Sequence, residues 1–384
     1  MSASDQENVR FSKGLEGIVA AESSVGYVDG LAGKLVYRGY DVNTLVENCD
    51  YEEVSYLLLN GELPNREQYK DYSSSLRKKR QLDNDTLNLI RDLKDTHPMS
   101  ALRTVISFIG ARDNRSIEPD LETQKSISID LIAKIPSVVA AINRAHNSKE
   151  FISPDDDLPF SSNFFYQALG RRPDKDEAKM IDEALILHAD HGMNASTFTS
   201  MVVISTLSDM YSAVTAAISS LKGPLHGGAN ERALALIQRV GKPENAEKVI
   251  SNMIASKEKI MGFGHRVYKV YDPRAKILKK FVETVTKKNG QENLFLTAEK
   301  IENIMAQTLG SKGIFPNVDF YSGLLYYSVG FDPSIFTPIF AVGRISGWTA
   351  RSLEYLSDNK IFRPRGMYVG NRGPKEFIPI DDRQ

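Results

Sequence analysis

Helical spacing of apolar residues runs through most of this chain after residue 50, and this pattern limits the fold more than any other feature. In windows such as 51–60, 66–79 and 85–93, apolar side chains recur three and four residues apart, and polar breaks separate the windows. Further helices are expected from residue 98 and over 126–146, 177–189, 197–221, 231–238, 244–257, 274–288, 296–309 and 338–356. Strand patterns after residue 40 are few, so the sequence predicts an all-α fold.

The segment 13–40 is the exception, because it is rich in glycine and in β-favouring residues. Asp29-Gly30 and Ala32-Gly33 are turn signals, so we expect minor β hairpins that form a small antiparallel sheet. Two prolines mark helices further on: Pro98 fits the first turn of one, and Pro136 is expected to kink another. The segment 149–159 is acidic and contains proline, which predicts a loop.

The charge and cysteine content exclude several classes of protein. Lys and Arg total 48 against 49 Asp and Glu, so the net charge is −1, and no long block of one sign occurs. Nucleic acid and anionic membranes are therefore not expected as partners. Cys49 is the only cysteine, which excludes an intramolecular disulfide. We expect a cytoplasmic protein, because residues 1–12 lack a signal pattern and no apolar run is expected to reach the roughly 18 residues of a membrane span.

The chemically versatile residues gather in three glycine-containing segments: 221–230 (Leu-Lys-Gly-Pro-Leu-His-Gly-Gly-Ala-Asn), 262–269 (Gly-Phe-Gly-His-Arg-Val-Tyr-Lys) and 317–323 (Asn-Val-Asp-Phe-Tyr-Ser-Gly). They place His226, His265 and Asp319 at turns or element ends, where backbone can approach a ligand closely. The local pattern of Asp319 also fits a helix N-cap. His226 is equally compatible with a turn histidine that is bonded to backbone.

These segments and several others resemble the citrate synthase family. In the family's order, the chain carries His97-Pro-Met-Ser-Ala-Leu-Arg, Leu187-His-Ala-Asp-His-Gly-Met-Asn-Ala-Ser, Lys222-Gly-Pro-Leu-His-Gly-Gly-Ala-Asn, Met261-Gly-Phe-Gly-His-Arg-Val-Tyr-Lys, Tyr271-Asp-Pro-Arg, Pro316-Asn-Val-Asp-Phe-Tyr-Ser-Gly and Phe362-Arg-Pro-Arg. The resemblance covers nearly the whole chain and is to the short prokaryotic form. It implies a helical homodimer with a large domain over 1–221, a small domain over 222–324, and a return to the large domain with a C-terminal arm over 325–384.

The resemblance also implies an activity, the condensation of acetyl-CoA with oxaloacetate and the hydrolysis of citryl-CoA to citrate and CoA. Asp319 would be the base that takes a proton from the acetyl methyl group, at a position before a small Tyr-Ser-Gly turn. A carboxylate is a mild base, so His226 would help as a neutral donor to the enolate oxygen. His265 would donate to the ketone carbonyl of oxaloacetate.

By the same resemblance, oxaloacetate would be bound by His191, Arg274, Arg344 and Arg363. Arginine suits this role because it offers a planar, permanently charged pair of donors to each carboxylate. Arg363 would reach the active site of the partner subunit. Arg351 shares a helix face with Arg344 and is a lesser candidate.

The CoA substrate is expected to meet Lys269 and Lys312, and its adenine would lie along the backbone of Met261, Gly262, Phe263 and Gly264. Lys257 and Lys259 are weaker candidates.

His188, Asn194 and Ser196 are expected to support the substrate-facing rings rather than touch substrate. His188 and His191 share one helix face, but the sequence offers no further ligands at suitable positions, so no metal site is expected. No tightly bound cofactor is expected either.

Two alternatives stay open. A 2-methylcitrate synthase would use propionyl-CoA with the same catalytic residues, since one methylene is worth only about 1–3 kcal/mol of discrimination. A non-catalytic dimer could instead bind CoA or a dicarboxylate for regulation. The intact set of His226, His265 and Asp319 argues against that second alternative.

Overall fold

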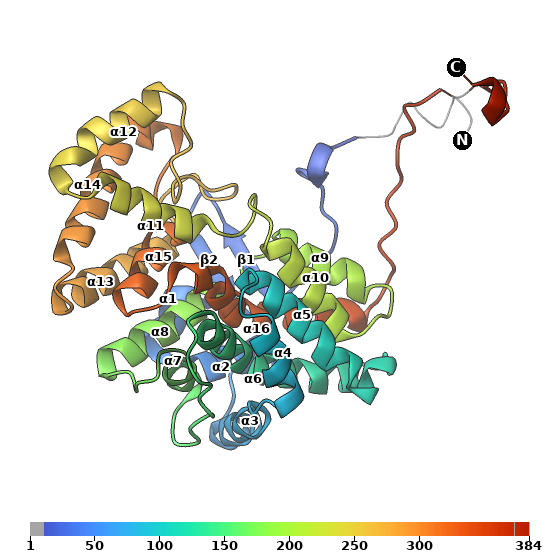
Figure 1. Cartoon of the computed structure of the whole chain (residues 1–384), viewed down its shortest axis with the longest axis horizontal. Coiled ribbons are helices and arrows are strands. Elements are labelled where there is room, and N and C mark those ends of the chain that lie inside the picture. The colour runs from blue at the N-terminus through green and yellow to red at the C-terminus, as the bar shows by residue number, and fades with distance from the viewer. Residues whose placement is uncertain (1–10, 372, 384) are drawn as a thin grey trace.

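The computed structural model describes residues 11–371 and 373–383, and helices account for most of them, as predicted (Figure 1). The first ten helices are α1 (Val42–Asn48), α2 (Tyr51–Asn60), α3 (Arg66–Lys79), α4 (Asn84–Asp92), α5 (Pro98–Ala111), α6 (Leu121–His146), α7 (Phe160–Leu169), α8 (Lys175–His188), α9 (Ala195–Ile204) and α10 (Met210–Leu221). The remaining six are α11 (Ala229–Val240), α12 (Ala246–Ala255), α13 (Pro273–Lys288), α14 (Glu292–Leu309), α15 (Val318–Ser328) and α16 (Phe336–Ser357).

Helices begin where polar or proline residues precede an apolar window. At α2 the Asp50 carboxylate accepts the amide of Glu53, and the Glu53 carboxylate accepts the amide of Asp50, which forms a capping box. Pro98 occupies the first turn of α5, as predicted, and the preceding His97 caps it through Nδ1. These local signals explain why most predicted helices, α2 and α3 above all, have the expected bounds.

Two predictions are wrong, and two helices were not predicted. The single helix predicted over 197–221 is wrong, because the chain breaks between α9 and α10, where Leu207 has φ 65° and Asp209 caps α10 by accepting the amide of Ser212. The turn predicted after Asp319 is also wrong, because these residues lie inside α15. Helices α1 and α7 were not predicted.

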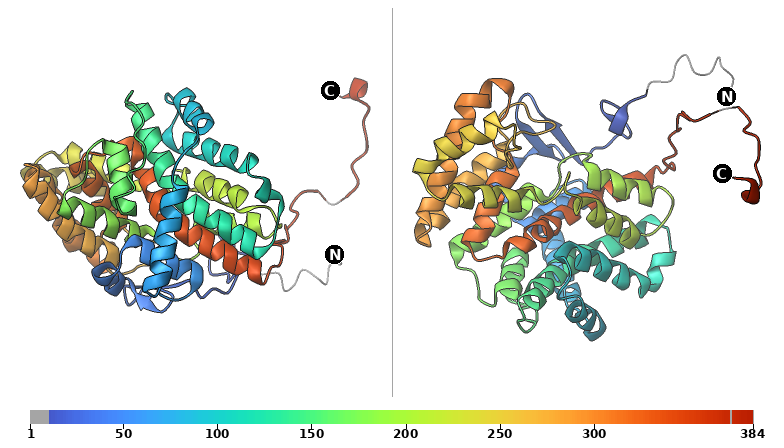
Figure 2. Two further views of the ribbon diagram at one scale, coloured as in Figure 1. Left: turned by 90° about the horizontal axis from the view of Figure 1, so that it is seen from below. Right: turned by 45° about the horizontal axis from the view of Figure 1, so that its top comes forward.

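The predicted small sheet is confirmed. Its strands β1 (Gly26–Asp29), β2 (Lys34–Tyr37) and β3 (Tyr40–Asp41) are antiparallel in the order β1-β2-β3. β1 and β2 form a hairpin in which Gly26 pairs with Tyr37 and Asp29 pairs with Lys34. Figure 2 shows the sheet beside the helices of the 222–324 segment.

The core is centred on two long helices, α6 and α16, which pack against each other. α6 is long and apolar enough to cross a membrane by composition alone, which corrects the expectation that no apolar run reaches this length. However, 83% of its apolar window is buried inside the protein, as in a core helix. α6 continues across Pro136, and its kink stays a prediction.

Helices α11 to α14 gather on one side of the molecule, and α15 packs on α11 and α13 (Figure 1). Gly323 of α15 allows this packing, since a Cβ there would lie 2.3 Å from the carbonyl oxygen of Asn230 in α11. After α16, the C-terminal segment runs away from the helical body as an extended, exposed chain (Figures 1 and 2).

Candidate active site

A cleft of about 1150 Å³ lies where the loops before α9, α11 and α13 meet the first turns of α15 and α16. Six residues predicted to act on substrate line this cleft, although they are spread over more than a third of the chain: His191, His226, His265, Arg274, Asp319 and Arg344. The fold therefore brings the three glycine-containing segments together, as their chemistry requires.

His226 projects from the loop that precedes α11, which closes on itself through the amides of His226 and Gly227 donating to the carbonyl of Gly223. Its Nε2 accepts the backbone amide of Ser196 at 3.3 Å and lies 2.9 Å from the Ser196 hydroxyl. An amide can only donate, so this contact favours the neutral ring with its proton on Nδ1. Burial, reinforced by the charge of Arg344, lowers the pKa of His226 to about 4.

His265 lies in the loop before α13, and its Nδ1 accepts the amides of Val267 and Tyr268 at 3.0 and 3.1 Å. The neutral ring must therefore carry its proton on Nε2. Burial and the nearby Arg274 lower the pKa of His265 to about 4. Both histidines are thus neutral N–H donors at physiological pH.

Asp319 stands in the first turn of α15. The cap is Asn317, whose Oδ1 accepts the Asp319 amide at 3.0 Å, so the N-cap interpretation of Asp319 is wrong. Burial raises the pKa of Asp319 from 3.8 to about 6, against the attraction of Arg274, and the neighbouring carboxylate of Asp272 adds to the rise. A base with this pKa is stronger than an exposed aspartate yet still ionised at neutral pH.

The loops carrying His265 and Asp319 are joined by backbone hydrogen bonds. Gly264 donates to the carbonyl of Phe315 at 2.8 Å, and Asn317 donates to the carbonyl of Gly262 at 2.9 Å. Gly262 has φ +83°, and a Cβ there would lie 2.9 Å from the Cβ of Phe320. Only glycine fits this position, which lets the loop of His265 pack closely against the start of α15, where Asp319 lies.

Arg274, in the first turn of α13, is almost completely buried and is held by Asp272. Its Nε donates to Oδ1 at 3.0 Å and its Nη2 donates to Oδ2 at 2.8 Å. Nη1 has no hydrogen-bond partner among the described residues, and the side chain lines the cleft. This nitrogen is positioned to donate to an anionic ligand.

Arg344 is buried in α16, and burial lowers the pKa of its guanidinium to about 10. Its Nε donates to the carbonyl of His188 at 2.5 Å, and its guanidinium lies 4.7 Å from the ring centroid of Phe340. The described residues offer no hydrogen-bond acceptor to its two terminal nitrogens. A charge buried without a carboxylate partner is costly, which fits a site that receives an anion.

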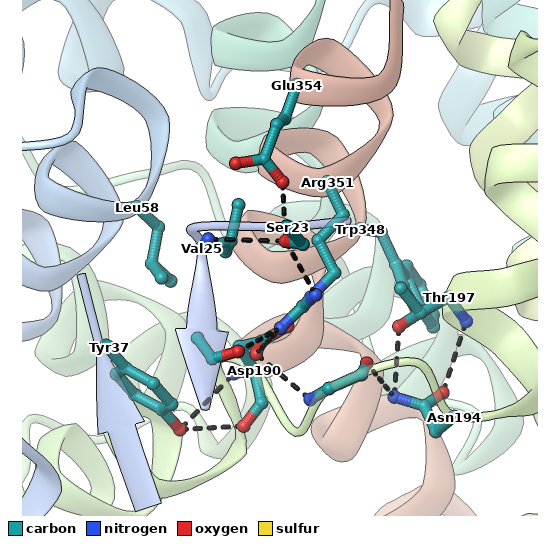
Figure 3. A network of polar contacts seen from close by, with 12 residues as sticks. Ser23, Val25, Tyr37, Leu58, Asp190, Asn194, Thr197, Trp348, Arg351 and Glu354 are labelled. Atoms are coloured by element: carbon teal, nitrogen blue, oxygen red, sulfur yellow. Dashed lines mark hydrogen bonds and ion pairs between the residues drawn. The ribbon is translucent and has the colours of Figure 1, made fainter. Parts of the chain in front are cut away.

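His191 follows the end of α8, and its Nε2 lies 3.2 Å from the hydroxyl of Tyr268. Its ring meets that of His265 edge-on, with centroids 5.1 Å apart. Next to it, Asp190 is fully buried and receives Nε and Nη2 of Arg351 at 2.7 and 2.8 Å (Figure 3). The guanidinium of Arg351 is therefore paired with Asp190 inside the fold. This pairing corrects the expectation that Arg351 is a lesser candidate for binding substrate.

The three predicted supporting residues lie behind the cleft or at its edge. Asn194 caps α9, and its Nδ2 donates to the hydroxyl of Thr197 at 2.9 Å. The hydroxyl of Ser196 accepts Nε1–H of Trp348 at 3.0 Å and lies 2.9 Å from Nε2 of His226, while its role as a support for that ring stays a prediction. His188 is fully buried against Phe340, with ring centroids 4.3 Å apart.

The expected CoA residues divide into two groups. Met261, Gly262, Phe263 and Gly264 line the cleft, as does Lys259. Lys269 and Lys312 are exposed and lie outside the lining, so this structure does not place them in the cleft. Arg363 is exposed on the C-terminal segment and is not among the residues that line the cleft of its own chain.

Tyr268, Asp272 and Phe340 belong to the site but were not assigned a role from the sequence. Asp272 had a readable signal, because Asp-Pro-Arg at a helix start places a cap two residues before the arginine. Tyr268 and Phe340 had none, since their contacts come from other segments. Within 11–371 and 373–383, no group of three or more His, Cys, Asp or Glu residues could hold a metal ion.

A helical protein whose cleft combines two neutral histidine donors, a carboxylate and two buried guanidiniums can bind a dicarboxylate and remove a proton beside it. The family model described as the citrate synthase C-terminal domain matches residues 14–365. The chain belongs to the citrate synthase family.

Relatives and solved structures agree with this assignment. The chain is 43% identical to a citrate synthase of Deinococcus radiodurans, over 97% of this chain and 99% of that one. It is 39% identical to 2-methylcitrate synthase 1 of Corynebacterium glutamicum, over 97% and 98%. It superposes with a TM-score of 0.93 and 34% identity on the Thermoplasma acidophilum citrate synthase, over 97% of this chain and all of that one, in a ternary complex with carboxymethyl coenzyme A and oxaloacetate. The Pyrobaculum aerophilum citrate synthase gives a TM-score of 0.92 and 42% identity, over 97% and 95%.

Proposed function

We propose that this protein condenses acetyl-CoA with oxaloacetate and hydrolyses the product thioester, so that it releases citrate and CoA. The observation that carries this proposal is the meeting of Asp319, with its raised pKa, and two neutral histidines in one cleft. Removing a proton from a thioester methyl group requires a base on one side and a donor to the developing enolate oxygen on the other.

In the first step, Asp319 takes the methyl proton while Nδ1–H of His226 donates to the thioester oxygen. The enol carbon then attacks the ketone carbon of oxaloacetate, and a carbon–carbon bond forms. Nε2–H of His265 donates a hydrogen bond to the ketone oxygen as it becomes an alkoxide, and the proton taken up by Asp319 balances the one that converts this alkoxide to the hydroxyl group of the product. A neutral donor is suited to both oxyanions because it supplies a hydrogen bond without first having to lose a strong ion pair.

The two carboxylates of oxaloacetate would meet Arg274 through Nη1 and Arg344 through its terminal nitrogens, with His191 beside them. These guanidiniums are buried, so their attraction for a dianion is little screened by water. Once the carbon–carbon bond has formed, water attacks the thioester carbonyl. The carbon–sulfur bond breaks, and CoA leaves as a thiol with citrate as the other product.

A second candidate, 2-methylcitrate synthase activity, is favoured by the 39% identical relative of that name. Propionyl-CoA adds one methylene beside the reacting carbon, and the residues named above would serve it equally. We propose acetyl-CoA as the preferred donor because the larger number of similar relatives bear the name citrate synthase.

The test is CoA release by the purified protein at saturating oxaloacetate, with acetyl-CoA and propionyl-CoA compared by kcat/KM. A higher kcat/KM for acetyl-CoA supports the proposal. A higher value for propionyl-CoA makes the second candidate correct. If neither thioester releases CoA, the protein is a non-catalytic binder and the catalytic assignment is wrong.

We also propose a homodimer in which Arg363 reaches the site of the partner subunit. The exposed position of Arg363, and exposed apolar side chains such as Ile361 and Phe377 on the same segment, support this. Mixing two inactive variants, Asp319→Asn and Arg363→Leu, tests it. If Arg363 acts across the interface, a mixed dimer has one intact site and regains activity; if it acts within its own chain, no site is intact.

The phosphates of CoA are proposed to meet Lys269 and Lys312, whose side chains are exposed. Of the two weaker candidates for binding CoA, Lys259 is favoured because it lines the cleft. We propose no tightly bound cofactor.

A further inference from the structure

The β1–β2 hairpin contacts both loops that carry the histidines around the oxaloacetate site. At its base, the carbonyl of Gly26 accepts Nη2 of Arg351 at 3.1 Å, and the same guanidinium holds Asp190. Asp190 precedes His191, and the amide of Gly192 donates to Oδ2 of Asp190 at 3.1 Å. The base of the hairpin is therefore tied to the loop of His191 through one buried ion pair (Figure 3).

At its tip, the hairpin touches the loop of His265. The carbonyl of Gly30 accepts the amide of Lys269 at 3.0 Å. A Cβ at Gly30 would lie 2.1 Å from the carbonyl oxygen of Val267, a distance no side chain tolerates. Val267 and Tyr268 supply the amides that hold Nδ1 of His265, so the Gly30 contact bears on the segment that fixes this ring.

The two loops depend on this outside contact because they are irregular. His191 and His265 are separated by 74 positions in the sequence, and their rings come into contact at the cleft. The Tyr268 hydroxyl lies 3.2 Å from Nε2 of His191 at the same place. The hairpin between them has a fixed antiparallel register from Gly26–Tyr37 to Asp29–Lys34. A short paired hairpin is stiffer than either loop, and Figure 2 shows it beside the 222–324 helices.

We propose that this hairpin is a strut that holds His191 and His265 at the spacing oxaloacetate requires, with Gly30 and Arg351 as its positioning residues. The role rests on the proposed function of the cleft and goes beyond it. Neither residue touches substrate. Because a misplacement of about 1 Å can cost around a hundredfold in a preorganised site, a small shift at either end weakens binding of the dicarboxylate.

The test is Gly30→Ala, whose methyl group forces the tip away from Val267. Gly30 does not adopt the left-handed conformation, so alanine adds the contact without backbone strain. We expect the Kd for oxaloacetate, measured by calorimetry without acyl-CoA, to rise at least about tenfold. The KM for acetyl-CoA at saturating oxaloacetate should change less than this Kd, although the tip also bonds the amide of Lys269, a proposed CoA residue. Leu31→Ala is the matched control, because Leu31 is in the same turn and its side chain is 78% exposed.

Arg351→Lys tests the base of the strut independently and covers the case in which Gly30→Ala does not fold. Lysine keeps the charge but loses the two-pronged contact with Asp190, so the Kd for oxaloacetate should again rise. Arg171→Lys is its control, since Arg171 holds Glu177 with two hydrogen bonds of 2.7 Å away from the cleft lining.

The proposed strut role is wrong if the variants fold and bind oxaloacetate with the Kd of the unmodified protein. If the unmodified protein also releases CoA, the proposed function still holds. An unmodified protein that neither binds oxaloacetate nor releases CoA would instead overturn the proposed function.

Discussion

Asp272 holds Arg274 in a two-pronged ion pair in which both side chains are about 98% buried or more. The same carboxylate accepts the amide of Val318 at 3.2 Å through Oδ2. It therefore links an arginine that faces the cleft to the first turn of α15, where Asp319 stands. One buried carboxylate positions both a binding group and the proposed base.

Replacing Asp272 by Asn should destabilise the protein by about 3–5 kcal/mol, because Arg274 would remain buried without its counter-charge. The Kd for oxaloacetate should rise as well, since Arg274 loses its orientation. Urea denaturation and calorimetry measure the two effects. Glu177→Gln is the control: its partner Arg171 is half exposed, so we expect a smaller loss of stability and an unchanged Kd. Equal stability of Asp272→Asn and the unmodified protein would contradict the role assigned to the pair.

The activity should depend on pH through Asp319. Its pKa is raised to about 6, and the base must be ionised to act, so kcat/KM for acetyl-CoA should rise as pH increases through about 6 and then level off. The pKa values of His226 and His265 are lowered to about 4, so neither adds a limb above about pH 5. Initial rates of CoA release between pH 5 and 8 measure this profile. A rate that is flat from pH 5 to 7 would exclude Asp319 as the group that titrates.

Asp319→Asn should lower kcat by roughly 10²- to 10⁴-fold and yet stabilise the protein at neutral pH. In the folded state the pKa of Asp319 is raised from 3.8 to about 6, so folding favours the protonated form. That contribution is complete below pH 3.8 and is lost as pH rises through about 6.

Asparagine has the shape of the protonated carboxyl group and does not ionise. The variant should therefore come close to the unmodified protein near pH 4 and exceed its stability near pH 7.5 by about 3 kcal/mol. Thermal unfolding at the two pH values gives the difference. A variant that is less stable than the unmodified protein at neutral pH would show that the charged carboxylate is not strained in the fold.

The rings of His226 and His265 should be opposite tautomers at pH 7. His265 accepts two amides at Nδ1 and must carry its proton on Nε2, whereas the Ser196 amide at Nε2 of His226 favours a proton on Nδ1. Nitrogen-15 NMR of selectively labelled protein distinguishes the tautomers, with His226→Gln and His265→Gln giving the assignment. A protonated Nδ1 on His265, or a charged ring on either residue, would contradict the proposed donors.

The positions of several site residues could be predicted from local signals in the sequence, whereas their roles came from the resemblance to the citrate synthase family. Glycines around His226 and His265 mark places where backbone turns closely, and Asp-Pro before Arg274 marks a helix start. Asp319 lies at the end of a secondary-structure element, as predicted. The turn predicted to follow it is wrong, because a helix begins there. The apolar spacing of 317–328 is weak because nearly every side of α15 is buried, and a helix buried all round leaves no polar face to reveal its period.

The sequence by itself determined most of the helices, the hairpin and the set of reactive side chains, because these depend on spacing, caps and turns between near neighbours. Only the tertiary structure decided what each side chain meets. Arg351 has the local setting of a substrate-binding arginine, yet its guanidinium is paired with the carboxylate of Asp190. Arg344 lies two turns earlier on the same face of α16 and has no carboxylate partner among the described residues. Such pairing is set by packing between segments more than 150 residues apart, where burial makes an unpaired charge costly, and no local pattern records it.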